Sequence, residues 1–208
     1  MESQWLTYAK RLQAIASTGL HFSANGFDRE RYLEVGAIAN EMLAQLGDVP
    51  VERIAELVSD FAKGYATPKV DVRGALIEDG KVLLVREKDD GRWSLPGGWA
   101  DVNQSLREAV LREVCEETGF EVTIRKLAAV FDRSKHPHVP VRPFHIYKHF
   151  FICEIAGGAA RTSLETTEIG FFTESDLPAE ISIGRVLPYQ IGRMFAHYRA
   201  PDLPTEFD

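Results

Sequence analysis

The stretch from Gly97 to Phe120, GGWADVNQSLREAVLREVCEETGF, places the strongest constraint on the fold of this chain. Its second half predicts a helix that begins after a cap at Asn103 or Ser105 and ends at Gly119. Since helical residues are about 100° apart, three carboxylates fall on one face, those of Glu113, Glu116 and Glu117. The opposite face carries an apolar stripe of Val110, Leu111, Val114, Cys115 and Thr118. The pattern therefore predicts a helix with a buried apolar back and an anionic front.

The glutamates of this helix favour a divalent cation site. Like charges at these spacings destabilise a helix by roughly 0.2 to 0.5 kcal/mol per pair, and a bound cation removes that repulsion. Mg²⁺ prefers oxygen ligands and commonly binds a few carboxylates together with substrate phosphates. The glutamates alone are more typical of a solvated acidic face. The preceding Gly97–Gly98 pair, the adjacent Arg112 and the terminal Gly119 favour the metal site instead.

The same stretch resembles the signature of the Nudix hydrolases, G-x5-E-x7-REUxEExGU, in which U is an aliphatic or aromatic residue. The residues that match it are Gly98, Arg112, Glu113, Val114, Glu116, Glu117, Gly119 and Phe120. The first Glu of the signature is Gln104 here, and Asn103 stands where a glycine is common. In the family that first Glu supports the site while the later ones hold the metal. The resemblance therefore implies that the change is tolerated, and it leaves the number of bound metal ions open.

The resemblance also implies a Mg²⁺-dependent enzyme, with Mn²⁺ as a possible substitute. Bound Mg²⁺ can neutralise phosphoryl oxygens and deprotonate a water during hydrolysis of a phosphoanhydride. The expected metal ligands are the carbonyl of Gly97 and the carboxylates of Glu113, Glu116 and Glu117. Arg112 is expected to orient a neighbouring glutamate, and a surface salt bridge is the alternative role for it. The expected catalytic set is Arg112, Glu113, Glu117 and Glu168, and the general base remains open among Glu113, Glu165 and Glu168.

A loop of prolines and cations at residues 131–144, FDRSKHPHVPVRPF, is expected to select the substrate. Loops on a rigid scaffold commonly carry binding residues. The candidate phosphate contacts are Arg133 and Lys135 in this loop and Arg73 and Arg86 in the first two predicted strands. Arg73 and Arg86 could equally serve surface roles. A zinc site at His136 and His138 is disfavoured, because no cysteine or acidic residue lies nearby at ligand spacing.

The chain is expected to divide into a small all-α N-terminal domain, residues 1–66, and a Nudix domain, residues 67–208. Apolar residues at helical spacing predict three helices in the first domain. They cover residues 4–18 with Gly19 as the stop, residues 28–46 between Asp28 and Gly47, and the segment from Val51 to Gly64.

The second domain is expected to be α+β. Runs of apolar and β-branched residues predict strands over 69–79, 81–88, 121–133, 145–155 and 168–172, and a final helix over 188–198. Asp79-Gly80 predicts a hairpin turn between the first two strands, and Gly157-Gly158 predicts a turn after the fourth. The resemblance implies the same architecture, the α/β/α sandwich with a mixed sheet of the Nudix fold.

Charge and composition limit the partners. A net charge of −7 argues against broad binding to nucleic acids or anionic membranes, which needs a basic surface. Through Ala66 there are six Lys or Arg against nine Asp or Glu, a balance of −3, so DNA reading by the helices is disfavoured. No apolar run approaches the ~20 residues of a membrane helix, and no signal-peptide layout is present. With Cys115 and Cys153 expected as buried free thiols, these features predict a cytoplasmic protein.

The helical domain is expected to serve as a dimerisation element or a lid, because short amphipathic helices are marginal alone. The order of segments resembles a subgroup of Nudix pyrophosphatases that carry a helical N-terminal domain and form homodimers. Whether the helices exchange between subunits stays open.

With the loop at 131–144 and the run ETTEIGFF at 165–172, the resemblance extends over nearly the whole chain to CDP-choline and ADP-ribose pyrophosphatases. It implies cleavage of a nucleoside diphosphate linked to another moiety into a nucleoside monophosphate and a phosphorylated group. CDP-choline is the first choice of substrate and ADP-ribose the alternative. A function of another class, a nucleotide-sensing regulator without catalysis, is supported only by Gln104. Processing of RNA ends is disfavoured by the acidic balance.

Overall fold

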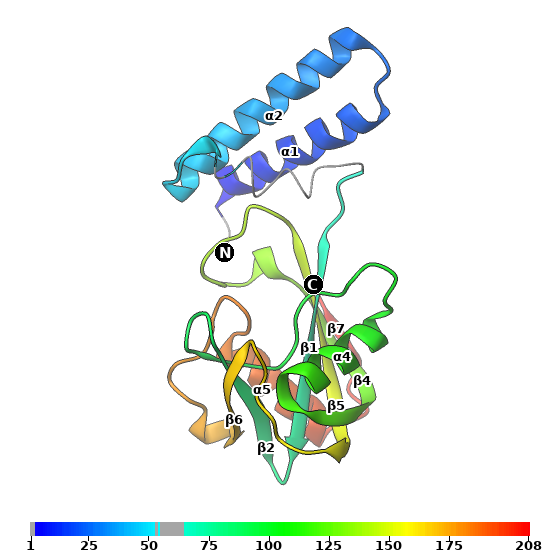
Figure 1. Cartoon of the computed structure of the whole chain (residues 1–208), viewed down its shortest axis with the longest axis vertical. Helices are drawn as coiled ribbons and strands as arrows, with labels where there is room; N and C mark the ends of the chain where they lie inside the picture. The colour runs from blue at the N-terminus through cyan, green and yellow to red at the C-terminus, as the bar shows by residue number, and fades with distance from the viewer. Residues whose placement is uncertain (1–2, 53, 55–64) are drawn as a thin grey trace. The chain divides into compact units, whose positions relative to one another are not determined.

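A computed structural model of the chain describes residues 3–52, 54 and 65–208, and the chain divides into two compact units (Figure 1). The first unit comprises Met1–Lys69 and Val141–His145, and the second comprises Val70–Pro140 and Ile146–Asp208. A short segment from the middle of the chain therefore groups with the N-terminal helices.

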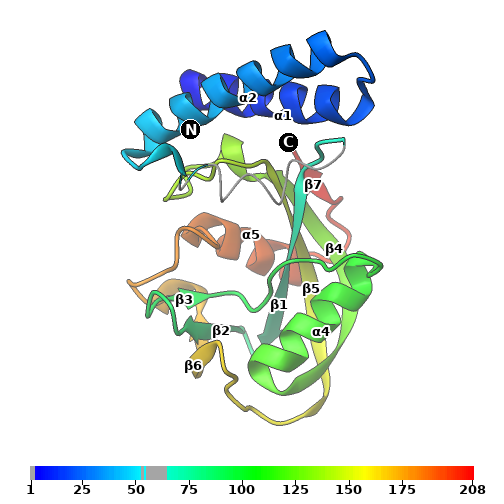
Figure 2. The same ribbon diagram turned by 45° about the horizontal axis from the view of Figure 1, so that its top comes forward.

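The first unit contains the helices α1 (Gln4–Phe22) and α2 (Gly26–Gly47), which lie side by side in both views (Figures 1 and 2). Two predictions about them are wrong. Gly19 does not stop α1, which continues to Phe22. A Cβ at position 19 would lie only 2.3 Å from the ring of Tyr32, so the glycine permits close approach of the helices. The start of α2 is capped by Asn25, whose side chain accepts from the backbone N–H of Phe27, and not by Asp28.

The third predicted helix, from Val51 to Gly64, lies mainly outside the described residues. The described core of this unit contains Leu6, Ala9, Leu43, Ala44 and Ile54. None of the helices that the structure describes is both long and apolar enough to cross a membrane.

The second unit is built on a seven-stranded mixed sheet with the order β3-β2-β1-β5-β4-β7, and β6 pairs with β2. The strands are β1 (Lys69–Glu78), β2 (Lys81–Glu87), β3 (Trp93–Ser94), β4 (Phe120–Asp132), β5 (Ile146–Gly158), β6 (Thr166–Thr173) and β7 (Glu206–Phe207). The β1–β2, β2–β6 and β4–β5 pairs are antiparallel, whereas β7 is parallel to β4.

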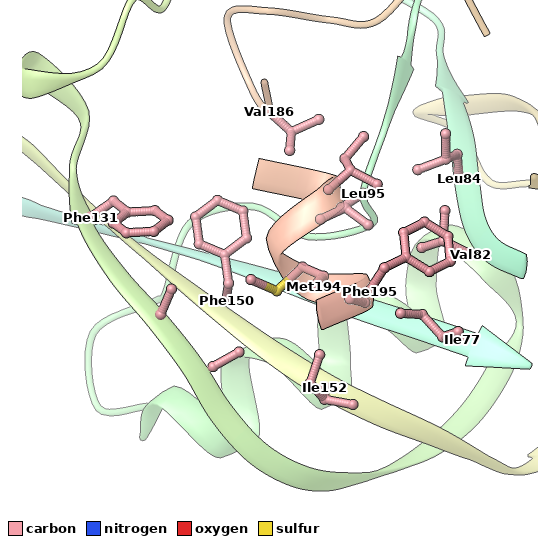
Figure 3. Packing of buried hydrophobic residues seen from close by; sticks show 14 of the residues in the cluster. Ile77, Val82, Leu84, Leu95, Phe131, Phe150, Ile152, Val186, Met194 and Phe195 are labelled. Atoms are coloured by element: carbon pink, nitrogen blue, oxygen red, sulfur yellow. The ribbon is translucent and has the colours of Figure 1, made fainter. Parts of the chain in front are cut away.

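Two helices, α4 (Leu106–Thr118) and α5 (Pro188–Arg199), cover opposite faces of this sheet (Figure 2). Alternate residues of β1 separate the two cores: Val72 and Leu76 pack with α4, while Ala75 and Ile77 pack with α5. Met194 and Phe195 of α5 lie against this second core in Figure 3. The predicted α/β/α sandwich is confirmed. Short 3₁₀ turns at Arg133–Lys135 and Glu174–Asp176 follow β4 and β6.

The predicted hairpin and the final helix are also confirmed. Asp79 and Gly80 both adopt left-handed conformations, as a two-residue turn between antiparallel strands requires. The turn predicted at Gly157-Gly158 is wrong, because both glycines lie within β5 and pair with Glu121 and Phe120 of β4. The two-residue strands β3 and β7 were not predicted.

Candidate active site

Helix α4 begins at a capping box, which fixes its first turn. The hydroxyl of Ser105 accepts from the backbone N–H of Glu108, and the Glu108 carboxylate accepts from the backbone N–H of Ser105. Ser105 is therefore the cap, whereas Asn103 lies in the preceding turn with φ +69°. Gly119 ends the helix in the left-handed conformation with φ +76°.

The glutamates of α4 do not share one exposed face, so the predicted division of the helix is wrong in part. Glu117 is buried, with 5% of its surface exposed, whereas Glu116 is exposed and Glu113 is half-buried. Glu117 follows Val110 and Val114 at the i, i+4, i+7 spacing of the buried stripe. Cys115, expected to be buried, is exposed instead. That spacing could have identified Glu117 as a carboxylate on the buried side.

The glycine pair lies between α4 and β1, and the packing leaves no room for side chains. The backbone N–H of Gly97 donates to the Glu117 carboxylate over 2.8 Å. A Cβ at Gly97, where φ is +138°, would lie 2.1 Å from the carbonyl oxygen of Val72. A Cβ at Gly98 would lie 2.9 Å from both carboxylate oxygens of Glu113. The glycines thus allow the two glutamates to approach the backbone of this turn.

Burial changes the protonation of the carboxylates here. It raises the pKa of Glu117 to about 8; the Arg73 guanidinium opposes the shift and the nearby Glu87 carboxylate adds to it. Burial also raises the pKa of Glu113, although the Arg112 guanidinium acts against the change. Both groups therefore resist ionisation when no cation is present.

Glu87 was not among the predicted residues, yet it belongs to the same electrostatic environment. It is buried at the end of β2, and burial raises its pKa. Its Oε1 lies 3.0 Å from Nε of Arg185, which supplies one counter-charge. Strand alternation could have found it, because Leu83 and Val85 of β2 pack on the α4 side and Glu87 is the next residue in that series.

Arg112 contacts several acceptors on the exposed side of the helix. Its Nη2 lies 3.0 Å from Oε1 of Glu113, and its Nη1 donates to Glu116 over 2.8 Å. The guanidinium also donates to the carbonyl of Trp99 and to the side-chain oxygen of Gln104. The amide of Gln104 therefore accepts the hydrogen bond that a carboxylate at this position would accept.

The predicted phosphate contacts on β1 and in the 131–144 loop differ in their exposure. Arg73 and Arg133 are buried, with 4% and 6% of their surfaces exposed. Arg73 forms an ion pair with Asp71, and Arg133 donates to the carbonyl oxygens of Pro140 and Gly184. Lys135 is exposed in the turn after β4.

The predicted base on β6 is engaged in another ion pair. Glu168 lies opposite Arg86 in the β2–β6 pair, and its Oε1 is 2.8 Å from the Arg86 guanidinium. Arg86 also donates to the carbonyl oxygen of Gly91. Glu165 is exposed, and its carbonyl accepts from the backbone N–H of Lys88. The α4 glutamates, Arg112 and the glycine turn thus form one group, and Arg86 with Glu168 forms another.

Among the described residues, no three His, Cys, Asp or Glu side chains converge closely enough to hold a metal ion as they stand. The donor chemistry nevertheless fits a hard cation. Carboxylates of Glu113 and Glu117 border the Gly97–Gly98 backbone, and burial makes both costly to ionise. Mg²⁺ prefers such oxygen ligands and would offset that cost.

Comparison with known proteins decides the family. The family described as NUDIX domain matches residues 68–190, and the family described as UDP-X-like, N-terminal oligomerisation domain matches residues 3–58. The chain belongs to the Nudix hydrolase family. As a Nudix hydrolase, it is an enzyme that acts on phosphorus-containing acid anhydrides.

Three relatives of this Nudix hydrolase are informative. The Bacillus subtilis (strain 168) protein YjhB, provisionally named an ADP-ribose pyrophosphatase, is 42% identical over 208 residues, which are 100% of this chain and 99% of that protein. A crystal structure titled an ADP-ribose pyrophosphatase, from Streptococcus suis, is 38% identical with a TM-score of 0.62, and the match covers 68% of this chain and 100% of that one. A crystal structure titled UDP-X diphosphatase is 34% identical with a TM-score of 0.64, over 100% of both chains.

Proposed function

We propose that this Nudix hydrolase is a Mg²⁺-dependent pyrophosphohydrolase that cleaves ADP-ribose, or a chemically similar nucleoside diphosphate sugar, into a nucleoside monophosphate and a sugar phosphate. The observation that carries the reaction class is the buried Glu117 carboxylate, held at the backbone of Gly97 beside Glu113. The substrate rests on the relatives, two of which are named for ADP-ribose. Those names support the ADP-ribose alternative better than the CDP-choline expected first.

A UDP-linked compound is the second candidate. The N-terminal domain matches a family described as UDP-X-like, and the structure titled UDP-X diphosphatase matches over the full length of both chains. The two candidates share the diphosphate and differ in the nucleobase, so they place the same demands on the α4 carboxylates.

The cation would be held by the carbonyl of Gly97 and the carboxylates of Glu113 and Glu117, with the exposed Glu116 as a further ligand. Bound Mg²⁺, or Mn²⁺ in its place, supplies charge neutralisation at the phosphoryl oxygens and lowers the pKa of a water. Arg112 orients Glu113 and Glu116 by its paired contacts with both. Arg112 also donates to the side chain of Gln104, and this set of contacts supports a positioning role for the arginine.

The general base is either Glu113 on α4 or a carboxylate on β6 or the loop before it, Glu168 or Glu165. Glu168 is paired with Arg86, so it would have to leave that ion pair to accept a proton. A pH–rate profile separates these assignments. Loss of the acidic limb in only one of the variants Glu113→Gln, Glu165→Gln and Glu168→Gln assigns the base to that residue.

The proposed substrate is tested by incubating the folded protein with Mg²⁺ and ADP-ribose, UDP-glucose or CDP-choline. The released AMP, UMP or CMP is then measured. The highest kcat/KM is expected for ADP-ribose. A higher value for UDP-glucose would favour the second candidate, and no nucleoside monophosphate from any compound would contradict the proposal.

We also propose that residues 1–66 form an association domain and residues 67–208 the catalytic domain, and that the protein is a homodimer in the cytoplasm. The match to an oligomerisation domain supports self-association more than a lid. The net charge of −7 supports a small nucleotide as the partner and not nucleic acid. A nucleotide sensor without catalysis stays the alternative, and nucleotide binding by the folded protein without hydrolysis of any of these compounds would favour it.

A further inference from the structure

A buried ion cluster on β1 and β5 contains the arginine whose charge acts on Glu113 and Glu117 of α4. It consists of Asp71, Arg73 and Lys148, whose exposed fractions are 4%, 4% and 2%. Arg73 donates from Nε and Nη2 to the two oxygens of Asp71, over 3.1 and 2.8 Å. Lys148 Nζ donates to Oδ1 of Asp71 over 2.5 Å. Burying three charges carries a large desolvation cost, so the cluster calls for a role beyond stability.

The cluster fixes the orientation of the Arg73 guanidinium. Burial alone would raise the pKa of Asp71, but the adjacent Arg73 and Lys148 cations lower it to about 2. Asp71 is therefore ionised at any working pH. Its two carboxylate oxygens accept from two of the three guanidinium nitrogens and so fix the orientation of that planar group. The direction of the remaining nitrogen, Nη1, is then fixed as well.

The remaining nitrogen reaches the segment that precedes the glycine pair. Nη1 of Arg73 donates to the carbonyl oxygen of Leu95 over 3.2 Å and lies 3.5 Å from the hydroxyl of Ser94. Both of these residues are fully buried. The guanidinium thus connects the β1 cluster to the chain that leads into the active-site turn.

That turn is also held against β1 by backbone hydrogen bonds. The N–H groups of Val72 and Gly74 donate to the carbonyls of Gly98 and Pro96, over 2.8 and 2.9 Å. Gly97 lies between these two anchors and donates to Glu117. A shift of the segment before the turn would therefore move the Gly97 carbonyl relative to the Glu117 carboxylate.

We propose that Arg73 is a positioning residue: held by Asp71 and Lys148, its guanidinium fixes the Leu95–Gly98 segment so that the Gly97 carbonyl and the Glu117 carboxylate are placed to receive one divalent cation. Lysine cannot replace it, because an ammonium group lacks the planar fork that binds Asp71 and Leu95 together. The inference rests on the proposed function, in which Gly97 and Glu117 are cation ligands.

The test compares Mn²⁺ binding to the full-length wild type and to Arg73→Lys, measured directly from the EPR signal of free Mn²⁺. Residues that orient metal ligands commonly contribute about 10-fold to 100-fold in metal affinity, so Arg73→Lys should weaken Mn²⁺ binding by about 10-fold or more. The Mg²⁺ concentration for half-maximal hydrolysis should rise in parallel, while KM for the nucleotide at saturating Mg²⁺ stays unchanged. Wild-type Mn²⁺ affinity in the folded Arg73→Lys protein would overturn the proposal.

The matched control is Ile152→Ala, which weakens the buried core on β5, the strand that carries Lys148. It should lower the melting temperature without changing Mn²⁺ affinity, and an equal loss of affinity in this control would show that Arg73 acts only through stability. If Arg73→Lys does not fold, Asp71→Asn decides the question by the same criteria, because it removes the charge that orients the guanidinium.

Glu117→Gln in the same assay separates the two proposals. Unchanged Mn²⁺ binding in Glu117→Gln would refute the cation site itself. Lost binding in Glu117→Gln together with unchanged binding in Arg73→Lys would refute only the positioning role.

Discussion

Glu117 is the side chain on which we expect hydrolysis to depend most. Glu117→Gln should lower kcat/KM on the order of 100-fold or more, since a neutral amide is a weaker ligand for a hard cation than a carboxylate. The neighbouring Glu116→Gln is the matched control, because Glu116 is exposed and paired with Arg112, and it should cost less activity. Steady-state hydrolysis of ADP-ribose measures both. A larger loss in Glu116→Gln would reverse the order of importance proposed for these residues.

His138 should make the stability of the protein depend on pH. Burial lowers the pKa of His138 from 6.5 to about 3, and the nearby Lys148 and Arg133 cations act in the same direction, against the hydrogen bond to the carbonyl of Ile183. A base with a depressed folded-state pKa is neutral in both states above pH 6.5, so its contribution is complete there. As the pH falls from 6.5 towards 3, the unfolded chain takes up the proton first, and the free energy of unfolding decreases by up to about 1.4 kcal/mol per pH unit.

Chemical denaturation of the wild type and His138→Gln between pH 7 and pH 4 checks this expectation. The difference in unfolding free energy between the two proteins should shrink as the pH falls. The exposed His21 of α1 provides the control, since His21→Gln should leave the profile unchanged. A constant difference for His138→Gln would contradict the assigned state of this histidine.

Individual residues could be predicted where the sequence pattern is local. The spacing of Glu113 and Glu117 on one helix identified the central carboxylates of the candidate site, because both belong to a single element. The burial of Glu117, and the position of Glu87 in the same environment, depend on how α4 packs against β1 and β2. Spacing within α4 and alternation along β2 indicate the two glutamates, but the rotation of α4 that exposes Cys115 is set by its packing against the sheet.

The glycine turn before α4 should tolerate no side chain. Gly97→Ala places a Cβ 2.1 Å from the carbonyl oxygen of Val72 at a φ of +138°, so β1 or the turn must move. We expect a loss of stability of about 2 to 4 kcal/mol and a loss of most activity. Thermal unfolding and hydrolysis rates measure the two effects.

Gly91→Ala is the control for the turn. Gly91 also has a positive φ, +67°, but a Cβ there would meet nothing within 4 Å. The variant should lose about 1 kcal/mol of stability and keep its activity. Similar activity losses in the two variants would mean that backbone strain alone explains the effect at Gly97.

Secondary structure was predictable for elements with long periodic patterns, such as α4, α5 and the β1–β2 hairpin. The errors occurred where tertiary contacts override a local signal. Gly19 is a helix stop by propensity, yet the ring of Tyr32 occupies the space where a side chain would lie. The two-residue strands β3 and β7 are too short for any period and exist because neighbouring strands supply their partners.

The N-terminal helices should make the protein a dimer. They carry exposed apolar side chains, among them Ile15 and Leu33, at 54% and 59% exposure. Light scattering coupled to size exclusion should give twice the mass of one chain. The double substitution Ile15→Glu with Leu33→Glu should shift the protein towards the monomer, since charge at an apolar interface is costly.

Leu164→Glu is the control for this shift, because Leu164 lies in the second unit and is 88% exposed. It should leave the mass unchanged. A monomeric wild type at micromolar concentration would contradict the homodimer, and an unchanged mass in the double variant would exclude these two side chains from its interface.

The general architecture was predictable because composition changes between the helical N-terminus and the β-rich remainder, whereas the division at residue 66 stays a prediction. The grouping of Val141–His145 with the first unit was not, since no local pattern marks a segment that returns to a distant part of the chain. Substrate choice was also beyond the sequence pattern, because the candidate substrates share the diphosphate that the α4 carboxylates are proposed to act on and differ in their nucleobases.

The burial of Glu117 links catalytic activity to the stability of the folded protein. Burial and the nearby Glu87 make the ionised form of Glu117 unfavourable. A bound Mg²⁺ would offset that cost, and it would bind only the native form. Removing the ion with a chelator would therefore lower the stability of the protein as well as its activity. At low Mg²⁺ concentration, the metal-free enzyme would be more susceptible to proteolysis than the metal-bound enzyme.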